Sequence, residues 1–226
     1  DWTTITGVGT GQFKFRSGVL GNNGLIYGIP HFATFVLIID PHTDTIDTTT
    51  LSGLGTDPHK WFGGVVLRDG RIFCVPSSAD TVLIIDPDSN TLDTTSIVGL
   101  TGGGLKWTGG VLANNGLIYG IPRSSDSVPI IDPVAMTADT TSITGLSEQH
   151  KWIGGVLAAN GKVVGIPSTS DAVLIIDPET NTADTATLTG IGTERPNYLG
   201  GVLASNGKIF GISFNADNVL LIDSGC

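Results

Sequence analysis

The fourteen residues Gly109–Pro122, GGVLANNGLIYGIP, form a phrase that the chain repeats. Residues Ser17–Pro30 read SGVLGNNGLIYGIP and differ from it at only two of the fourteen positions. Three further copies begin at Gly63, Gly154 and Gly200, and they read GGVVLRDGRIFCVP, GGVLAANGKVVGIP and GGVLASNGKIFGIS. Self-similarity at a fixed period is the signature of a repeat architecture, so the fold must be explained by five copies of one unit.

The spacing of the copies is nearly constant. The glycine of an Asn-Gly or Asp-Gly pair recurs in steps of 46, 46, 45 and 46 residues, at Gly24, Gly70, Gly116, Gly161 and Gly207. An aspartate that ends an apolar run recurs in the same steps, at Asp40, Asp86, Asp132, Asp177 and Asp223. A period of about 40 to 50 residues with several short strands per unit predicts the blades of a β-propeller.

Each copy predicts four antiparallel strands. The GGVLA phrase is followed by an Asn-Gly or Asp-Gly turn, the strongest short hairpin signal, and then by the LIYGIP phrase, which Pro stops in four copies. The apolar run Val82–Asp86 and its equivalents predict a strand buried on both faces. The threonine-rich phrase Asp47–Gly53 and its equivalents predict a polar outer strand.

The two ends of the sequence fit a closed ring. The chain ends at Asp223–Cys226, just after the fifth apolar run, and it begins with DWTTITG, which matches the threonine-rich phrases. We therefore expect Trp2–Thr6 to lie alongside Val219–Asp223 and to complete the last blade. The sequence thus predicts an all-β, five-bladed β-propeller, with four antiparallel strands per blade, as a single domain spanning residues 1–226.

The composition limits the kinds of binding partner and the locations that are expected for the protein. The formal net charge is −10, which makes a nucleic-acid partner unexpected because an acidic surface repels phosphates. No apolar run approaches the roughly 18 residues of a membrane span. Cys74 and Cys226 occupy different repeat positions, so we expect a buried free thiol at Cys74 and no disulfide scaffold. No signal-like segment is seen, and the threonine-rich, lysine-poor composition favours an extracellular or cell-surface location.

Two resemblances follow from these phrases. The VLIIDPxTNT phrase resembles the repeats of YVTN and NHL-type β-propellers over about ten residues per unit. Five blades of about 46 residues are similar in number and length to the tachylectin-2 type of lectin propeller, although the sugar-binding signature of that family is absent. The second resemblance implies carbohydrate binding, as an expectation from fold rather than from motif.

The loops between outer and inner strands end in a recurring basic and aromatic pair, and the loops after the second strand carry a recurring aspartate. In a propeller these two sets of loops share one face. The paired positions are Lys14-Phe15, Lys60-Trp61, Lys106-Trp107, Lys151-Trp152 and Asn197-Tyr198. The aspartates are Asp80, Asp126, Asp171 and Asp217, and Thr34 takes this position in the first unit.

These repeated residues have two interpretations. As several equal, shallow sites, the aromatic rings would stack on sugars, and the lysines and aspartates would bind hydroxyl groups, with affinity gained through multivalency. As structure, the aromatic rings would pack between blades, the lysines would be solvated, and the aspartates would form turns. The ligand-binding residues predicted here are those of the last four pairs together with the four aspartates.

Metal binding and catalysis find little support in the sequence. Asp86, Asp88 and Asn90 have the one-three-five spacing of a calcium loop but lack its later Gly and Glu, so a hairpin turn explains them better. No nucleophile motif or metal-ligand spacing occurs, and we expect no catalytic residue, no metal and no cofactor. His31, Phe32 and Arg123 depart from the repeat and could form one asymmetric site.

Three functions remain, in order of preference. The first is a non-enzymatic, lectin-like module that binds glycans or another small ligand on the loop face. The second is a structural or protein-interaction propeller within a larger extracellular assembly. The third is a propeller hydrolase or lactonase, which would need one asymmetric pocket with a titrating group of shifted pKa.

Overall fold

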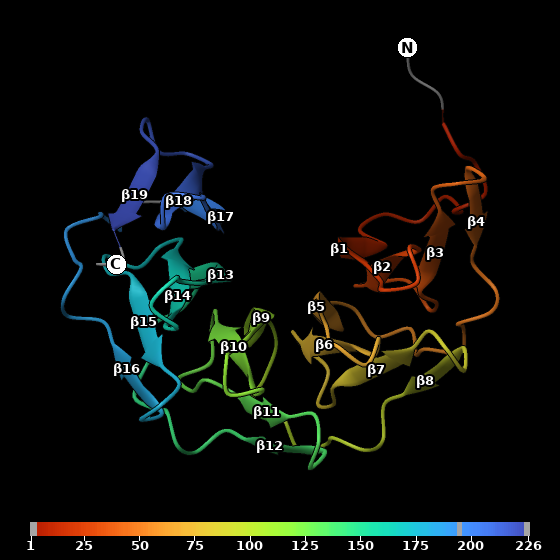
Figure 1. The fold of residues 1–226 in the computed structure, drawn as a ribbon, viewed down its shortest axis with the longest axis horizontal. Helices are drawn as coiled ribbons and strands as arrows, with labels where there is room; N and C mark the ends of the chain where they lie inside the picture. Colours follow the sequence, from red (N-terminus) through yellow and green to blue (C-terminus); the bar gives the residue numbers. More distant parts are fainter. Residues whose placement is uncertain (1–3, 194–195, 224–226) are drawn as a thin grey trace. The chain divides into compact units, whose positions relative to one another are not determined.

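A computed structural model describes residues 4–193 and 196–223. The chain divides into two compact units, residues 1–101 and 102–226. The prediction of a single domain therefore stays a prediction. No helix occurs among the described residues, and every sheet is antiparallel with its strands in sequence order (Figure 1).

The first unit contains two four-stranded sheets. The strands of the first sheet are β1 (Phe15–Leu20), β2 (Ile26–Pro30), β3 (Leu37–Asp40) and β4 (Thr45–Asp47). Those of the second sheet are β5 (Trp61–Val66), β6 (Ile72–Pro76), β7 (Leu83–Asp86) and β8 (Thr91–Asp93).

The second unit contains three sheets. The strands of the third sheet are β9 (Trp107–Leu112), β10 (Ile118–Pro122), β11 (Ile130–Asp132) and β12 (Thr137–Asp139). Those of the fourth are β13 (Trp152–Leu157), β14 (Val163–Pro167), β15 (Leu174–Asp177) and β16 (Thr182–Asp184). The fifth sheet has three strands among the described residues, β17 (Tyr198–Leu203), β18 (Lys208–Ser213) and β19 (Leu220–Asp223).

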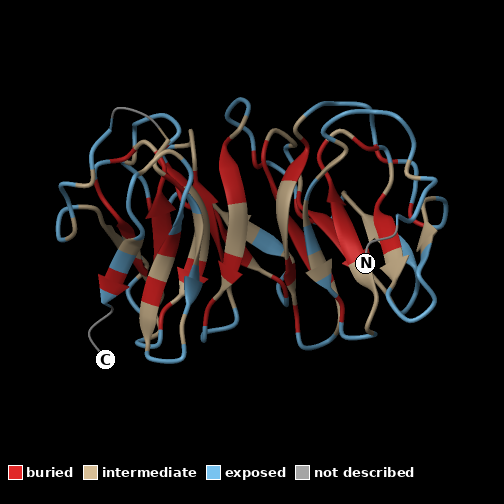
Figure 2. Ribbon diagram, turned by 90° about the horizontal axis from the view of Figure 1, so that it is seen from above, coloured by how far each residue is buried: buried red, intermediate tan, exposed pale blue. Residues whose placement is uncertain are grey.

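The predicted hairpins and buried strands are confirmed. Strands β5 and β6 pair through the predicted Asp-Gly turn, with Val66 opposite Ile72. Leu83, Ile84 and Ile85 in β7 are all buried, as an apolar run packed on both faces requires. Figure 2 shows buried residues along the strands and exposed residues in the loops that join them. Cys74 is a buried free thiol, and burial raises its pKa.

The paired glycines of the first strand allow neighbouring sheets to approach closely. In the second unit, Gly154 has φ +74°, and a Cβ there would lie 3.1 Å from the Cα of Gly200 in the next sheet. A Cβ on Gly155 would lie 2.6 Å from Cδ1 of Ile121 in the preceding sheet. Any larger residue would force these strands apart, which explains why the GG pair recurs.

The threonine-rich phrases are not the outer strands, contrary to the prediction. The outer strand is instead the three residues that end at the first residue of each phrase, such as Thr45–Asp47. Asp47 ends the strand because its carboxylate accepts hydrogen bonds from the amides of Thr49 (2.7 Å) and Thr50 (3.0 Å). Asp93, Asp139 and Asp184 form the same turn.

The predicted closing strand, Trp2–Thr6, matches the threonine-rich phrases in sequence, and those phrases follow the outer strands instead of forming them. Residues 1–3 lie outside the described residues, and Thr4, Ile5 and Thr6 form no strand. The expectation that Trp2–Thr6 completes the last sheet therefore stays a prediction. Four sheets of four strands and a fifth of three nevertheless fit the predicted five-bladed β-propeller.

Candidate functional site

The aromatic residues of the recurring pair belong to the core. Trp61, Trp107, Trp152 and Tyr198 are all buried. Each tryptophan donates its indole N–H to a backbone carbonyl twenty residues later at 2.8 Å, to Thr81, Ser127 and Ala172 in turn. The Tyr198 hydroxyl donates to the side chain of Asn218. These rings are thus buried, as the structural interpretation expects, and ligand contact at their edges stays a prediction.

The lysines are not solvated, which differs from the structural interpretation made from the sequence. Lys60, Lys106 and Lys151 are at most 4% exposed. The Lys60 ammonium donates to the carbonyl of Asp57 at 3.0 Å, and that of Lys106 donates to Gly103 at 3.1 Å. The Lys151 ammonium donates to Ser125 at 2.8 Å and also to Glu148. Each ammonium can be buried because it donates to carbonyl groups of its own loop, and that of Lys151 also donates to the loop after β10.

The backbone at this position also joins two loops. The Lys60 carbonyl accepts from the amides of Ser77 and Ala79 in the loop after β6. The Lys60 amide donates to the carbonyl of His31, in the loop of the preceding sheet, at 3.0 Å. In the second unit, the Asn197 carbonyl accepts from Phe214, and its amide donates to Ser168 at 2.7 Å. The same junction therefore forms whether the residue is Lys or Asn.

The recurring aspartates are exposed at the loop rim. Asp80, Asp126, Asp171 and Asp217 all fall in the exposed class. The Asp171 carboxylate accepts from the amides of Gly190 (3.2 Å) and Gly192 (2.7 Å), which ties its loop to the next one. The Asp80 carbonyl accepts from Leu100, and that of Asp126 accepts from Leu146. Asp80, Asp126 and Asp171 thus link their loops to the next one, and all four aspartates are exposed.

Equivalent positions of three sheets are hollowed into pockets. In the first unit, a pocket of about 520 Å³ is lined by Lys60, Trp61 and Asp80 together with Asp57 and His59. In the second unit, a pocket of about 310 Å³ is lined by Lys151, Trp152, Asp171 and Glu148. A further pocket of about 300 Å³ there is lined by Asn197, Tyr198, Asp217, Asn215 and Asn218. The predicted residues are thus brought together three times, each time around a hollow.

Oxygen-bearing side chains dominate the chemistry of these pockets. Burial lowers the pKa of the Lys151 ammonium to about 8, although Glu148 and Asp126 favour its charged form. Burial also lowers the pKa of Lys60. Because the ammonium groups donate to loop carbonyls, the pocket walls offer carboxylates, amides and hydroxyls to a ligand. Such walls suit ligands that donate hydrogen bonds.

The irregular residues of the sequence make two separate contacts. His31 lies against His59 in the first unit, with Nε2 of His31 2.9 Å from Nδ1 of His59. Arg123 donates from Nε to Nδ1 of His150 at 3.1 Å in the second unit. Sequence reasoning named His31, Phe32 and Arg123 but missed both histidine partners. Each partner directly precedes the recurring lysine of the following repeat, and this shared position is the signal that could have identified both partners.

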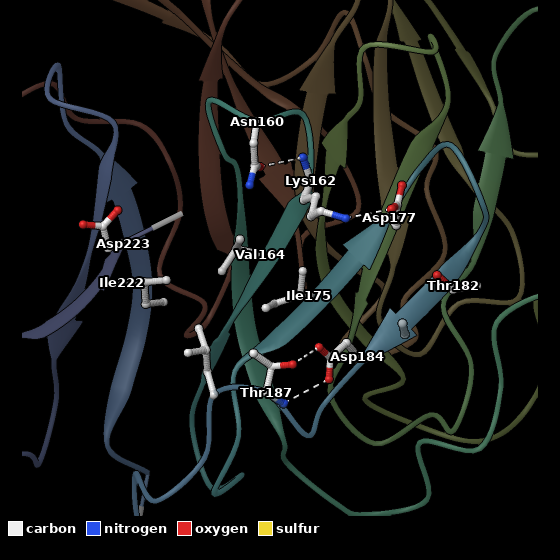
Figure 3. A pocket seen from close by; sticks show the side chains of 12 residues that line it. Asn160, Lys162, Val164, Ile175, Asp177, Thr182, Asp184, Thr187, Ile222 and Asp223 are labelled. Carbon is white, nitrogen blue, oxygen red and sulfur yellow. Dashed lines mark hydrogen bonds and ion pairs between the residues drawn. The ribbon is translucent and has the colours of Figure 1, made fainter. Parts of the chain in front are cut away.

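A groove between the fourth sheet and β19 was also missed. It measures about 410 Å³, and Val164, Ile175 and Ile222 are among its lining residues. Figure 3 shows Lys162 turned toward Asp177, with which it forms an ion pair of 2.7 Å, and Thr187 beside Asp184. The sequence pattern assigned these apolar residues to the core, and it gave no signal that a groove would remain beside β19.

No group of three or more His, Cys, Asp or Glu residues able to hold a metal ion occurs among the described residues. No segment of the described chain forms a helix long and apolar enough to span a lipid bilayer.

Comparisons with known proteins identify the fold. No protein-family model and no curated protein sequence matches the chain. A catalytically inactive variant of virginiamycin B lyase from Staphylococcus aureus, solved with quinupristin, is similar with a TM-score of 0.72 at 10% identity. The similarity covers 92% of this chain and 66% of the lyase.

Two further proteins are also similar in structure. The extracellular domain of BT4673 from B. thetaiotaomicron matches with a TM-score of 0.67 at 11% identity, over 93% of this chain and 28% of that one. An auxiliary nutrient binding protein from Bacteroides ovatus matches with a TM-score of 0.59 at 13% identity, over 93% and 55%. This chain spans less than two thirds of each protein, and at such low identity the likeness shows the propeller fold alone.

Proposed function

We propose that the protein is a non-enzymatic binding module that takes carbohydrate in repeated pockets on its loops. The observation that carries this proposal is the recurrence of the pocket at equivalent positions of the second, fourth and fifth sheets. An enzyme needs one site whose residues differ from those of the other repeats, whereas a module of repeated binding sites places the same residue types at each.

The pocket walls support neutral, hydroxyl-rich ligands over anionic ones. Asp80 and Asp57 lie on one pocket, and Asp171 and Glu148 lie on another. Carboxylates accept hydrogen bonds from sugar hydroxyls, whereas they repel sulfate, phosphate and carboxylate groups. Volumes of about 300 to 520 Å³ lie at the lower end of the usual range for small-ligand pockets, so each suits a small part of a glycan.

Several weak sites would act together on a branched or repeating glycan. Linked sites can raise avidity by about 10² to 10⁴ without any new contact. The similarity to an extracellular domain and to a nutrient binding protein supports an extracellular location.

A glycan array tests this function. The wild-type protein should bind neutral glycans and leave sulfated and sialylated ones unbound. Asp80→Asn, Asp171→Asn and Asp217→Asn, alone and combined, should lower avidity stepwise, because each removes negative charge from one pocket. Asp88→Asn, an exposed change in the turn after β7, is the matched control. An array without binding, or binding that survives the triple variant, would reject the proposal.

A protein-interaction module is the second candidate, and one observation favours it. Val202, Ile212, Val219 and Leu221 of the fifth sheet are each more than half exposed. An apolar group of this kind is unusual on a protein surface unless another surface covers it. Light scattering across a concentration series distinguishes the candidates, since an interaction module predicts association that Ile212→Asp abolishes.

A further inference from the structure

Two imidazole rings meet in the first unit. His31 follows β2 and is buried, and His59 precedes β5 and lines the pocket of the second sheet. Nδ1 of His31 lies 3.2 Å from the carbonyl oxygen of Trp61, and Nε2 of the same ring lies 2.9 Å from Nδ1 of His59. Because a carbonyl only accepts, Nδ1 of His31 carries the proton, and the lone pair of Nε2 points toward His59.

We propose that His31 and His59 form a two-histidine site for a divalent transition-metal ion such as Zn²⁺ or Cu²⁺. Imidazole nitrogens bind such ions at about 2.0 to 2.1 Å, so two nitrogens on adjacent positions of one ion lie about 2.9 to 3.4 Å apart. The separation of 2.9 Å falls at the lower end of that range. Coordination requires that His59 exchange its proton from Nδ1 to Nε2 through solvent, with no net gain or loss. It also requires the two lone pairs to converge on one point beside the line that joins the nitrogens.

The surroundings of the pair resemble those of metal-binding histidines. A ligating histidine usually donates its other N–H to a carbonyl or carboxylate, and His31 donates to Trp61. Phe32 packs edge-on against both imidazole rings, with centroids 5.2 Å from His31 and 4.7 Å from His59. The tautomer and orientation of His31 are therefore set before any ion arrives.

The site would be incomplete as protein alone, and this has consequences. No third His, Cys, Asp or Glu joins the pair among the described residues, so solvent or a ligand must fill the other positions. Arg16 and Lys60 add positive charge near His31 and oppose a cation. The ion must therefore be held by coordinate bonds to nitrogen, which excludes Ca²⁺ and Mg²⁺ because these ions prefer oxygen ligands.

The second unit provides a natural control. His150 occupies the repeat position of His59, but its partner is Arg123, whose guanidinium cannot coordinate a metal. His42 lies in the turn after β3 and is exposed. These two residues measure how much a single histidine contributes to ion binding by this protein.

Isothermal titration calorimetry with Zn²⁺ and Cu²⁺ tests the site on the full chain. The wild type should bind one ion, and His31→Ala and His59→Ala should each lower affinity at least tenfold, whereas His150→Ala and His42→Ala should not. Ca²⁺ and Mg²⁺ should give no heat of binding. The Cu²⁺ complex should show two coordinated nitrogens by electron paramagnetic resonance.

Three results would overturn the proposal: a wild type that binds no ion, binding that survives His59→Ala, or equal losses in the His150 variant. His59 is only half-buried, so its variant keeps the test valid if replacing His31 prevents folding. The proposal does not depend on carbohydrate binding, because glycan arrays and metal titrations report on it separately.

Discussion

The fourth and fifth sheets share one sequence pattern but differ in burial. Ile166 in β14 is 0% exposed, and its equivalent Ile212 in β18 is 53% exposed. Val173 before β15 is 2% exposed, whereas Val219 before β19 is 61% exposed. The fourth sheet packs against the third and the fifth within the second unit, and the fifth packs there against the fourth.

The difference shows what the repeated apolar pattern specifies. Each copy of the repeat forms a sheet with two apolar faces, one for the preceding sheet and one for the following sheet. The fifth sheet nevertheless leaves apolar side chains exposed at positions where the fourth sheet buries them. The burial of a side chain is thus determined by the neighbours of its sheet as much as by the sequence of that sheet.

The position at which the two sheets agree offers the largest test. Trp152 and Tyr198 are both buried, so Trp152→Ala should lower the free energy of unfolding by about 3 to 5 kcal/mol. Trp152→Phe, which keeps a ring but loses the hydrogen bond to Ala172, should cost about 1 kcal/mol. Chemical denaturation measures both. A stable Trp152→Ala variant that only loses glycan binding would show that the ring serves the ligand and not the core.

A position at which the two sheets differ strongly in burial offers the next test. Ile166→Ala should cost about 2 to 5 kcal/mol because it opens a cavity in a packed core. Ile212→Ala should cost less than about 1 kcal/mol, because an exposed side chain loses little burial. Equal costs in parallel denaturation curves would show that the face around Ile212 is covered in solution, and the contrast between the sheets would then disappear.

The turn that ends β16 offers the smallest test. Hydrogen bonds from Thr187 and Ala186 lower the pKa of Asp184, and similar bonds lower that of Asp139 to about 2. A carboxylate with a lowered pKa contributes stability above about pH 4, and this contribution is lost as the pH falls toward 2.

Thermal melting between pH 5 and pH 2 checks this dependence. The double variant Asp139→Ala and Asp184→Ala should have a lower midpoint at pH 5 and a smaller decrease in acid than the wild type. A wild-type profile that stays flat over this window would contradict the role of these turns.

Much of the fold could be predicted because the pattern is repeated and local. The period, the hairpin turns and the doubly buried runs each depend on neighbouring residues. The outer strand was misplaced because threonine suits strands, whereas the preceding aspartate bonds to two later amides and ends the strand. The strand propensity of threonine favoured one position for the outer strand, whereas a side-chain hydrogen bond determined another.

The candidate site was predicted only in part, for a similar reason. Repetition identified Lys60, Trp61 and Asp80 as neighbours, and the structure places them around one pocket. It could not show that the Lys60 ammonium turns toward its own loop. The meeting of His31 and His59 escaped prediction because these residues belong to different copies of the repeat and lie 28 positions apart.

The junction at the recurring lysine has a consequence for how such chains can change. The carbonyl and amide of Lys60 and Asn197 make the same bonds between loops, although their side chains differ. Every residue except proline offers these backbone groups, so the link between consecutive repeats requires no particular side chain at this point. A copy of the repeat can therefore be duplicated or exchanged without changing this link, while the loop residues around it vary.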